Sequence, residues 1–273
     1  MSENPKKFVP MDGSAVILAA HRGDKKRFPE NTMPAFRAAL AAGVDMIETD
    51  IHLTRDGELI IMHDRSALRT TGVDINTDES TLAELLALDA GAIFAPEFEG
   101  TKLPTVREFL EWVSKTNLTV NWELKDYPTV VGDEIAFAAA DKLLSLIEEY
   151  GMGERSMVNS FSARVLEHIE KAVGHRYPIH GQGIAGAPRS KDEPEQPLEE
   201  LFDWCCLYPD EKGKSPVDFK ANFDYCTERG ILPCVCIPEN AENYRRALDY
   251  GCRMFTSNDI LACDKLLREL GVR

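Results

Sequence analysis

The sequence predicts an α/β fold of the (β/α)8 TIM-barrel type, with a small insertion after the second strand. Strand-like apolar runs alternate with amphipathic helical runs about eight times, which favours a parallel sheet. The length of 273 residues is close to the roughly 250 residues of a single such barrel. No G-x-G-x-x-G or P-loop motif follows a predicted strand, which disfavours the alternative of a nucleotide-binding, doubly wound open sheet.

The first half of the chain supplies the most regular alternation. Asn31 or Thr32 is expected to cap the first helix, with Pro34 in its first turn and Gly43 at its end. The helix over 132–151 has apolar residues at helical spacing. In order, the predicted elements are strand 15–20, helix 31–43, strand 45–53, extended run 58–63, strand 118–124, helix 132–151, strand 156–161 and helix 163–174.

The second half continues the alternation with shorter strands. The predicted elements are strands 177–181, 203–208, 231–237 and 253–257, and helices 216–229, 240–250 and 259–270. Two segments depart from the pattern. Residues 64–104, with one short helical run at 81–91, are expected to form the insertion. Residues 185–197 are rich in proline and charge and are expected to form a mobile loop. For this loop we favour the interpretation of disorder over that of a lid on the active site. Without repeats or linkers, residues 1–273 are predicted to form one domain.

Composition limits the classes of function. Acids outnumber bases 46 to 31, and this net charge of −15 disfavours binding to nucleic acid or stable association with an anionic membrane. No run approaches the ~18 apolar residues of a membrane helix. The apolar run near the N-terminus is too short for a signal peptide. We therefore expect a soluble, cytoplasmic protein with reduced thiols. The oligomeric state is not indicated.

All seven cysteines lie in the second half, between Cys205 and Cys263. Cys234 and Cys236 alternate along the predicted strand 231–237. No second Cys or His pair lies at zinc-finger spacing, so the sequence favours buried free thiols over a metal site here.

Alternation along strand 45–53 separates polar from apolar side chains. Glu48, Asp50 and His52 share one face with Met46, and the apolar residues between them would meet the helices. Two buried carboxylates without partners would be very costly, so they require a metal ion or basic side chains. Oxygen-only ligands suit Mg²⁺, Ca²⁺ or Mn²⁺ better than zinc.

Other strands deliver charged groups to the same end of the predicted barrel. Glu123 and Lys125 share a face of strand 118–124, His21 and Arg22 follow the first strand, and His63 ends the run 58–63. Each residue alone is compatible with a cap or a solvated strand end. Together they favour a metal-assisted enzyme that acts on an anionic substrate at the carboxyl ends of the strands. The pattern does not name the bond that is broken.

The segment from His21 to Asp64 resembles the glycerophosphodiester phosphodiesterase family. The matching motifs are H-R-G, P-E-N-T, G-x-D-x-I-E-x-D, T-x-D-G and the terminal H-D, followed by W-E-L-K at 122–125 and S-F at 160–161. The resemblance covers residues 16–170 and becomes weaker beyond them.

This resemblance implies a barrel with an insertion between its second and third strands, and hydrolysis of small-molecule glycerophosphodiesters to an alcohol and sn-glycerol 3-phosphate. It also implies one divalent cation, Mg²⁺ or Ca²⁺. By position it implies metal ligands Glu48, Asp50 and Glu123, an acid–base pair His21 and His63, substrate- or phosphate-binding residues Arg22, Lys125 and Phe161, and nearby residues Glu30 and His52. Which histidine is the base is left open, as is the choice between attack by water and by a substrate hydroxyl.

The sequence departs from the family towards its C-terminal end. Cys236 stands about where the seventh strand commonly carries a tryptophan, and the eighth strand ends in FTSND rather than an I-T-D-like run. In the family these positions help to line the alcohol or glycerol pocket, so the identity of the head group is left open.

Two alternative functions remain. A lysophospholipid or sphingolipid phosphodiesterase is disfavoured by the acidic charge and the lack of an amphipathic membrane helix. A non-catalytic binding barrel is disfavoured by the complete set of charged residues.

Overall fold

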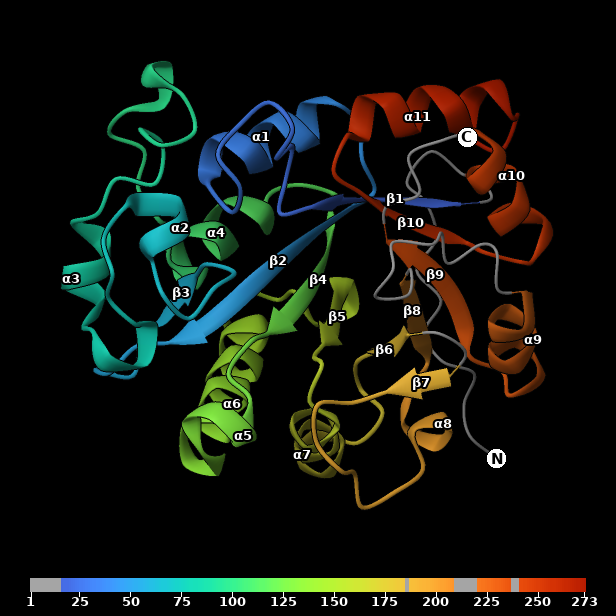
Figure 1. The fold of residues 1–273 in the computed structure, drawn as a ribbon. Helices are drawn as coiled ribbons and strands as arrows, with labels where there is room; N and C mark the ends of the chain where they lie inside the picture. Colours follow the sequence, from blue (N-terminus) through green and yellow to red (C-terminus); the bar gives the residue numbers. More distant parts are fainter. Residues whose placement is uncertain (1–15, 185–186, 209–219, 237–240) are drawn as a thin grey trace.

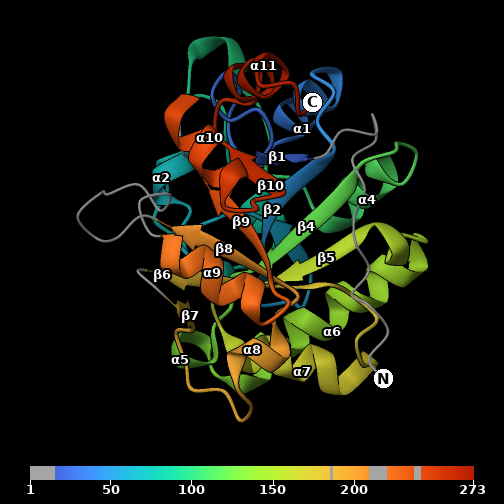
Figure 2. The ribbon, with the colours of Figure 1, turned by 90° about the vertical axis from the view of Figure 1, so that its right-hand side faces the viewer.

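Eight parallel strands close into a barrel with helices around it (Figure 1, Figure 2). The computed structural model describes residues 16–184, 187–208, 220–236 and 241–273. The barrel closes because β1 pairs with both β2 and β10. This confirms the predicted fold class. The barrel strands are β1 (Ile17–His21), β2 (Met46–Leu53), β4 (Thr119–Leu124), β5 (Ser156–Asn159), β6 (Ile179–Ile184), β8 (Trp204–Tyr208), β9 (Leu232–Cys236) and β10 (Met254–Ser257).

The helices lie outside this barrel or in its connections. They are α1 (Met33–Ala41), α2 (Leu68–Thr71), α3 (Leu82–Leu86), α4 (Val106–Val113), α5 (Pro128–Val131), α6 (Asp133–Glu149), α7 (Ala163–Val173), α8 (Leu198–Leu201), α9 (Lys220–Glu228), α10 (Ala241–Asp249) and α11 (Ile260–Glu269), with 3-10 turns η1 (Thr77–Glu79), η2 (Pro96–Phe98) and η3 (Gly153–Arg155). The sequence did not predict α4, although Thr105 caps it by accepting a hydrogen bond from the backbone N–H of Glu108.

The cap predicted for α1 is wrong in part. Thr32 occupies the N-cap position, but its hydroxyl donates to the carbonyl of Pro29 and caps nothing. Asn31 has a φ of 57° and turns its side chain towards Thr49 and Asp50. These two side chains therefore shape the loop before the helix, and Asn31 belongs to the polar end of the barrel.

The predicted alternation along β2 is confirmed. Ile47 and Ile51 belong to the large apolar cluster between the strands and the helices. Met46 faces inwards, where it joins a smaller cluster that fills one part of the barrel interior. Nine residues form this inner cluster: Ile17, Ala19, Met46, Met157, Trp204, Cys206, Cys234, Cys236 and Met254. The inner faces of the strands are therefore apolar in one layer and polar towards the carboxyl ends.

The insertion after β2 lies at the left of Figure 1. It begins beyond β3 (Leu59–Ile61), which pairs antiparallel with β2, and it contains α2, η1, α3 and η2. A separate small core of buried apolar residues holds it together, centred on Ile60, Met62 and Leu85. The predicted insertion over 64–104 thus has its own packed interior.

The expectation of disorder over 185–197 is wrong for most of that segment. β7 (Ala187–Arg189) pairs antiparallel with β6. Beyond it, the backbone N–H of Lys191 donates to the carbonyl of Phe161, and the hydroxyl of Ser162 donates to Asp192. These contacts fix the segment against the loop that follows β5. Parts of five predicted features fall outside the described residues: strand residue 15, loop residues 185–186, and the ends of strand 231–237 and of helices 216–229 and 240–250.

Gly181 on β6 offers a test of how tightly the barrel is packed. A Cβ at this position would lie 2.0 Å from a ring carbon of the buried Phe202. We expect Gly181→Ala to lower the free energy of unfolding by about 1–3 kcal/mol or more, because the ring or the strand must shift. Urea unfolding followed by circular dichroism measures this. The control is Gly153→Ala, whose Cβ would meet only the flexible ends of two side chains, Glu148 at 3.1 Å and Arg176 at 3.8 Å. Equal losses in the two variants would contradict the packing argument.

Candidate active site

Three carboxylates meet inside the mouth of the barrel. Glu48 and Asp50 come from β2 and Glu123 from β4, with Asp50 and Glu123 in direct register. One carboxylate oxygen from each lies within 4.8 Å of the others, and all three side chains are buried. The parity of two neighbouring strands thus places three negative charges in one small volume.

The electrostatics of this acidic triad call for a cation. Burial, and then repulsion by Asp50 and Glu123, raises the pKa of Glu48 well above its usual value. Burial also raises the pKa of Glu123, whereas the cations Lys125 and Arg22 outweigh burial and lower that of Asp50. Oε1 of Glu48 has no hydrogen-bond partner among the residues that the structure describes. A buried oxygen of this kind, in a set of oxygen donors, fits a hard divalent cation.

Two cations already lie against the triad. Lys125 contacts Glu123 and lies 3.1 Å from Oδ1 of Asp50. The guanidinium of Arg22 lies 3.1 Å from Oδ2 of Asp50, and its Nη1 donates to Glu30 at 3.0 Å. Arg22 has a φ of 60°, in the left-handed region, and its backbone N–H points at Glu48. This unfavourable backbone conformation is held by hydrogen bonds at the site, which is typical of functional loops.

His21 is held by a residue from the opposite end of the chain. Its Nδ1 lies 2.6 Å from Oδ1 of Asn258, and its Nε2 lies 3.8 Å from Glu48. With the Asn258 oxygen as acceptor, Nδ1 carries the hydrogen and Nε2 has a lone pair. Burial, and then the neighbouring Arg22 and Lys25, lowers the pKa of His21 to about 3, so the ring is neutral at pH 7.

His63 is oriented in the same way by a carboxylate. Its Nδ1 lies 2.6 Å from Oδ1 of Asp64, which leaves Nε2 available. Burial, and then Lys125, lowers the pKa of this ring to about 4. Arg69 of the insertion donates to both Asp64 and Glu30. The insertion therefore connects the residue that orients His63 to the residue that holds Arg22.

Glu30 and His52 each contact a predicted site residue and help to hold it in place. Burial alone would raise the pKa of Glu30, but hydrogen bonding to Arg69 and the charges of Arg22 and Lys25 lower it to about 2. His52 is buried, with Nδ1 2.6 Å from Asp126 and Nε2 3.2 Å from the backbone oxygen of His63. Both of its nitrogens have a partner, so His52 positions the segment that follows β3 and has no nitrogen available for substrate.

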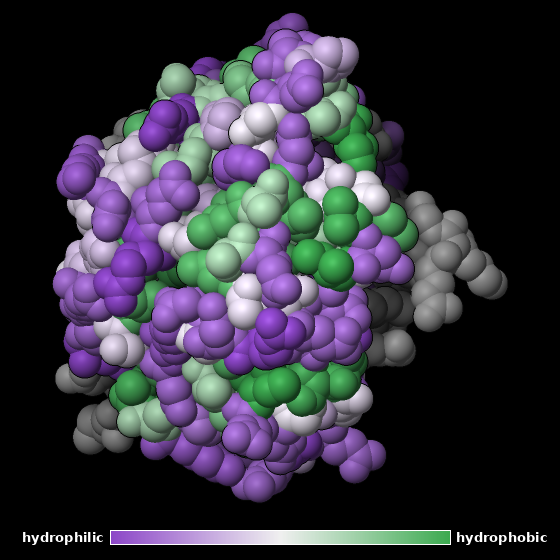
Figure 3. All heavy atoms as spheres, turned by 90° about the vertical axis from the view of Figure 1, so that its left-hand side faces the viewer, coloured by the Kyte–Doolittle hydropathy of each residue, from purple (hydrophilic) through white to green (hydrophobic). Residues whose placement is uncertain are grey.

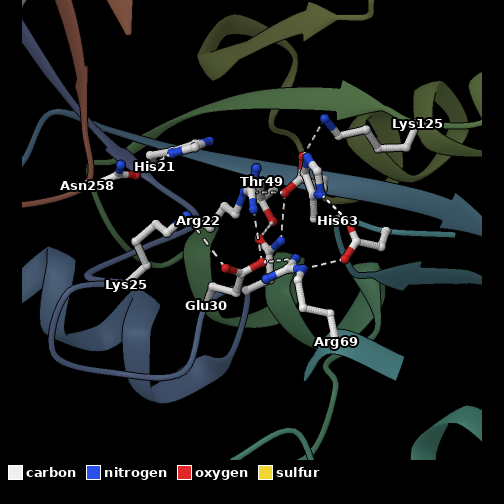
Figure 4. Close-up of polar contacts among 12 residues, drawn as sticks. His21, Arg22, Lys25, Glu30, Thr49, His63, Arg69, Lys125 and Asn258 are labelled. Atoms are coloured by element: carbon white, nitrogen blue, oxygen red, sulfur yellow. Dashed lines mark hydrogen bonds and ion pairs between the residues drawn. The ribbon is translucent and has the colours of Figure 1, made fainter. Parts of the chain in front are cut away.

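Figure 4 shows His21 with Asn258 on one side of Arg22, and His63 with Lys125 on the other. The structure therefore brings all ten predicted site residues to one end of the barrel: His21, Arg22, Glu30, Glu48, Asp50, His52, His63, Glu123, Lys125 and Phe161. The arrangement places two histidines with available Nε2 atoms beside two cations and a buried triad of acids.

Cavities open on two sides of this group. One of about 390 Å³ is bordered by His63, Lys125, Tyr127, Phe161 and Lys191, with the Phe161 ring 5.5 Å from each lysine ammonium. It combines aromatic walls with positive charge.

The second cavity, of about 310 Å³, lies against the insertion and is bordered by Lys25, Arg69, Ile93 and Phe94. Figure 3 looks onto the side of the molecule that carries the insertion and shows apolar patches among polar side chains. Ile93 is 56% exposed and Phe94 43% exposed, so this cavity has an apolar rim open to solvent.

Five further residues contact the predicted site residues, although the sequence analysis gave them no role in the site: Asn31, Asp64, Arg69, Asp126 and Asn258. Asp64 was visible as the last residue of the H-D motif. Asn258 directly follows the eighth strand. Because barrel enzymes place functional residues at the carboxyl ends of their strands, this position could have indicated Asn258 as a site residue.

The fold and the site together define a class: (β/α)8 barrels that gather acids, cations and histidines at the carboxyl ends of their strands. The chain belongs to the glycerophosphoryl diester phosphodiesterase family, whose model matches residues 21–231.

A glycerophosphodiester phosphodiesterase from Caldanaerobacter subterraneus subsp. tengcongensis is 37% identical over 163 residues, which cover 58% of this chain. The match spans 63% of that relative, less than two thirds of its length.

Solved structures of more distant members agree in fold. A structure ascribed to this family from Silicibacter pomeroyi has a TM-score of 0.79 at 21% identity and covers 97% of this chain and 99% of its own. A phosphodiesterase from Oleispira antarctica, solved with sn-glycerol-3-phosphate as product, has a TM-score of 0.75 at 20% identity and covers 92% and 96%. Within the described part of the chain, no helix is both long and apolar enough to cross a bilayer.

Proposed function

We propose that the protein hydrolyses glycerophosphodiesters to an alcohol and sn-glycerol 3-phosphate with the help of one divalent cation, Mg²⁺ or Ca²⁺. The observation that carries this proposal is the buried triad of Glu48, Asp50 and Glu123 between two oriented histidines. Family membership and the product in the Oleispira antarctica relative support the choice of substrate.

The charged residues have separate tasks in this proposal. Glu48, Asp50 and Glu123 would hold the cation, which supplies a Lewis acid to offset charge on a phosphoryl oxygen. Arg22 and Lys125 would bind the remaining phosphoryl oxygens, with Arg22 as the planar, two-pronged donor. Both side chains are held in place by acids before substrate arrives, which lowers the cost of orienting them.

His21 and His63 would transfer the protons. One Nε2 would take a proton from the attacking hydroxyl. The other Nε2 must first bind a proton from solvent, and it would deliver that proton to the leaving alkoxide. Asn258 and Asp64 keep the rings turned so that both Nε2 atoms are available. The attacking hydroxyl belongs either to water or to the neighbouring carbon of the glycerol. The second route passes through a cyclic glycerol phosphate that water then opens.

The two cavities can receive the two arms of a diester. The one beside Phe161 and Lys191 is positively charged and suits a polar arm. The one beside Ile93 and Phe94 has an apolar rim. That rim favours a second candidate function, a phosphodiesterase that acts on lysophospholipids, because an acyl chain could lie along it.

A panel of substrates tests both functions. Glycerol 3-phosphate should be released from glycerophosphocholine or glycerophosphoethanolamine, and EDTA should abolish this release until Mg²⁺ or Ca²⁺ is added. Full activity after exhaustive chelation would exclude the metal role. Faster turnover of lysophospholipid micelles than of the soluble diesters would make the second function the main one. A cyclic glycerol phosphate seen during turnover would identify the attacking group as the substrate's own hydroxyl.

A further inference from the structure

A second group of metal-ligating side chains lies deeper in the barrel. His180 comes from β6, Cys206 from β8 and Cys234 from β9, which are consecutive strands of the sheet. One donor atom from each lies within 4.8 Å of the others, and all three side chains are buried. Nε2 of His180 lies 3.1 Å from Sγ of Cys234, and Cys206 and Cys234 are register partners.

From this geometry we propose that His180, Cys206 and Cys234 bind a thiophilic divalent ion, Zn²⁺, inside the barrel. The donors are two sulfurs and one imidazole, which select Zn²⁺ over Mg²⁺ and Ca²⁺. Two thiolates and a neutral imidazole also balance the charge of Zn²⁺ to zero, which suits a site with little water. The acidic triad offers only oxygens and has the opposite preference.

The histidine is already turned towards the thiol by a polar neighbour. The amide of Asn121 on β4 contacts Nδ1 of His180 at 2.8 Å, and this contact directs Nε2 to Cys234. Half a turn of the amide would present its oxygen to an Nδ1–H, the tautomer in which Nε2 can bind a metal. Asn121 thereby acts as the outer partner that metal-binding histidines usually have.

A fourth ligand would lie in a small cavity beside His180 and Cys206. This cavity has a volume of about 10 Å³, lies between the two clusters and is bordered by Glu48, Glu123, His180 and Cys206. It is large enough for about one water molecule. Asn121 and Thr256 also border it, and Oγ1 of Thr256 has no hydrogen-bond partner within the described part of the chain. This buried hydroxyl points to a polar occupant, such as a metal-bound water.

The location of the other cysteines distinguishes this site from ordinary thiol packing. Cys205, Cys226, Cys252 and Cys263 lie in the apolar layer between strands and helices, where a thiol behaves as a small apolar group. Cys206, Cys234 and Cys236 face the barrel interior, and the first two of them lie beside a histidine. The sequence could not show this, because the three ligands come from three different strands.

Cadmium titration of the whole chain, freed of metal and refolded with Cd²⁺, tests the proposal. One equivalent should produce the ultraviolet sulfur-to-cadmium absorption band. The band should fall at least tenfold in Cys234→Ala and Cys206→Ala and persist in the control Cys252→Ala. It should also persist in Asp50→Asn, which alters the acidic triad at a residue that does not border the small cavity. The result therefore does not depend on the phosphodiesterase proposal. A band that survives in Cys234→Ala would overturn the assignment.

X-ray absorption spectroscopy of zinc-loaded wild-type protein needs no variant and covers the case in which an alanine variant does not fold. Two sulfur neighbours and one imidazole around zinc would support the site. A shell of nitrogen and oxygen alone would overturn it.

Discussion

Replacement of Glu123 by glutamine should weaken the binding of Mg²⁺ or Ca²⁺ by at least about 100-fold, since loss of even an outer partner of a metal ligand costs about 10–100-fold. The amide has the size of the carboxylate but removes one of three buried negative charges. Isothermal titration of the metal-free protein measures the affinity, and release of glycerol 3-phosphate measures the consequence for turnover. Hydrolysis at a fixed metal concentration should fall in parallel.

The variant is expected to fold. Burial and repulsion already disfavour the charges of Glu48 and Glu123, so loss of one charge relieves part of that cost. Lys125 keeps Asp50 as an ionic partner at 3.1 Å. Glu134→Gln, at an exposed position of α6, is the matched control and should leave metal affinity unchanged. If Glu123→Gln binds metal as tightly as wild type, the triad is not the cation site.

The sequence predicted those parts of the site that depend on one strand at a time. Alternation along β2 placed Glu48 and Asp50 on the inner face, and the same rule placed Glu123 on that of β4. These predictions needed only the period of a strand and the closure of a barrel, both of which follow from local pattern and length. The apolar residues that alternate with them along β2, such as Ile47, lie between the strands and the helices, as the pattern predicted.

Residues whose contact depends on three-dimensional placement were beyond that rule. Asn258 contacts His21 across 237 positions of sequence. Its position after the eighth strand placed it at this end of the barrel, but nothing in the sequence indicated which side chain it would contact. Arg69 reaches Glu30 only because the insertion folds back over the first loop. The described part of the predicted loop 185–197 was misjudged for a related reason. Proline and charge indicate a loop, but they do not indicate the pairing of β7 with β6.

His21→Ala and His63→Ala should each lower turnover by about 10²–10⁴-fold, the usual contribution of a general acid or base. In both rings Nδ1 contacts a fixed neighbour, Asn258 or Asp64, and Nε2 is available. The main chemical effect of each substitution is therefore the loss of this Nε2. Asp64 retains its contact with Arg69 when His63 is removed, which favours a folded variant. Circular dichroism and metal titration should therefore match wild type. A wild-type rate in either variant would exclude that histidine from the proton transfers.

The matched control is His168→Ala on α7. His168 has the same type of contact, with Nε2 2.7 Å from Asp141, but it lies on the outer helices. Its loss should leave turnover unchanged.

A nitrophenyl diester of glycerol phosphate separates the roles of general acid and general base, because its leaving group needs no proton. The variant that lacks the general acid should recover most of its rate on this substrate, whereas the variant that lacks the base should not. Asn258 and Asp64 both contact Nδ1 of the ring that they orient, so these contacts do not distinguish acid from base. The comparison of the two leaving groups makes that assignment for His21 and His63.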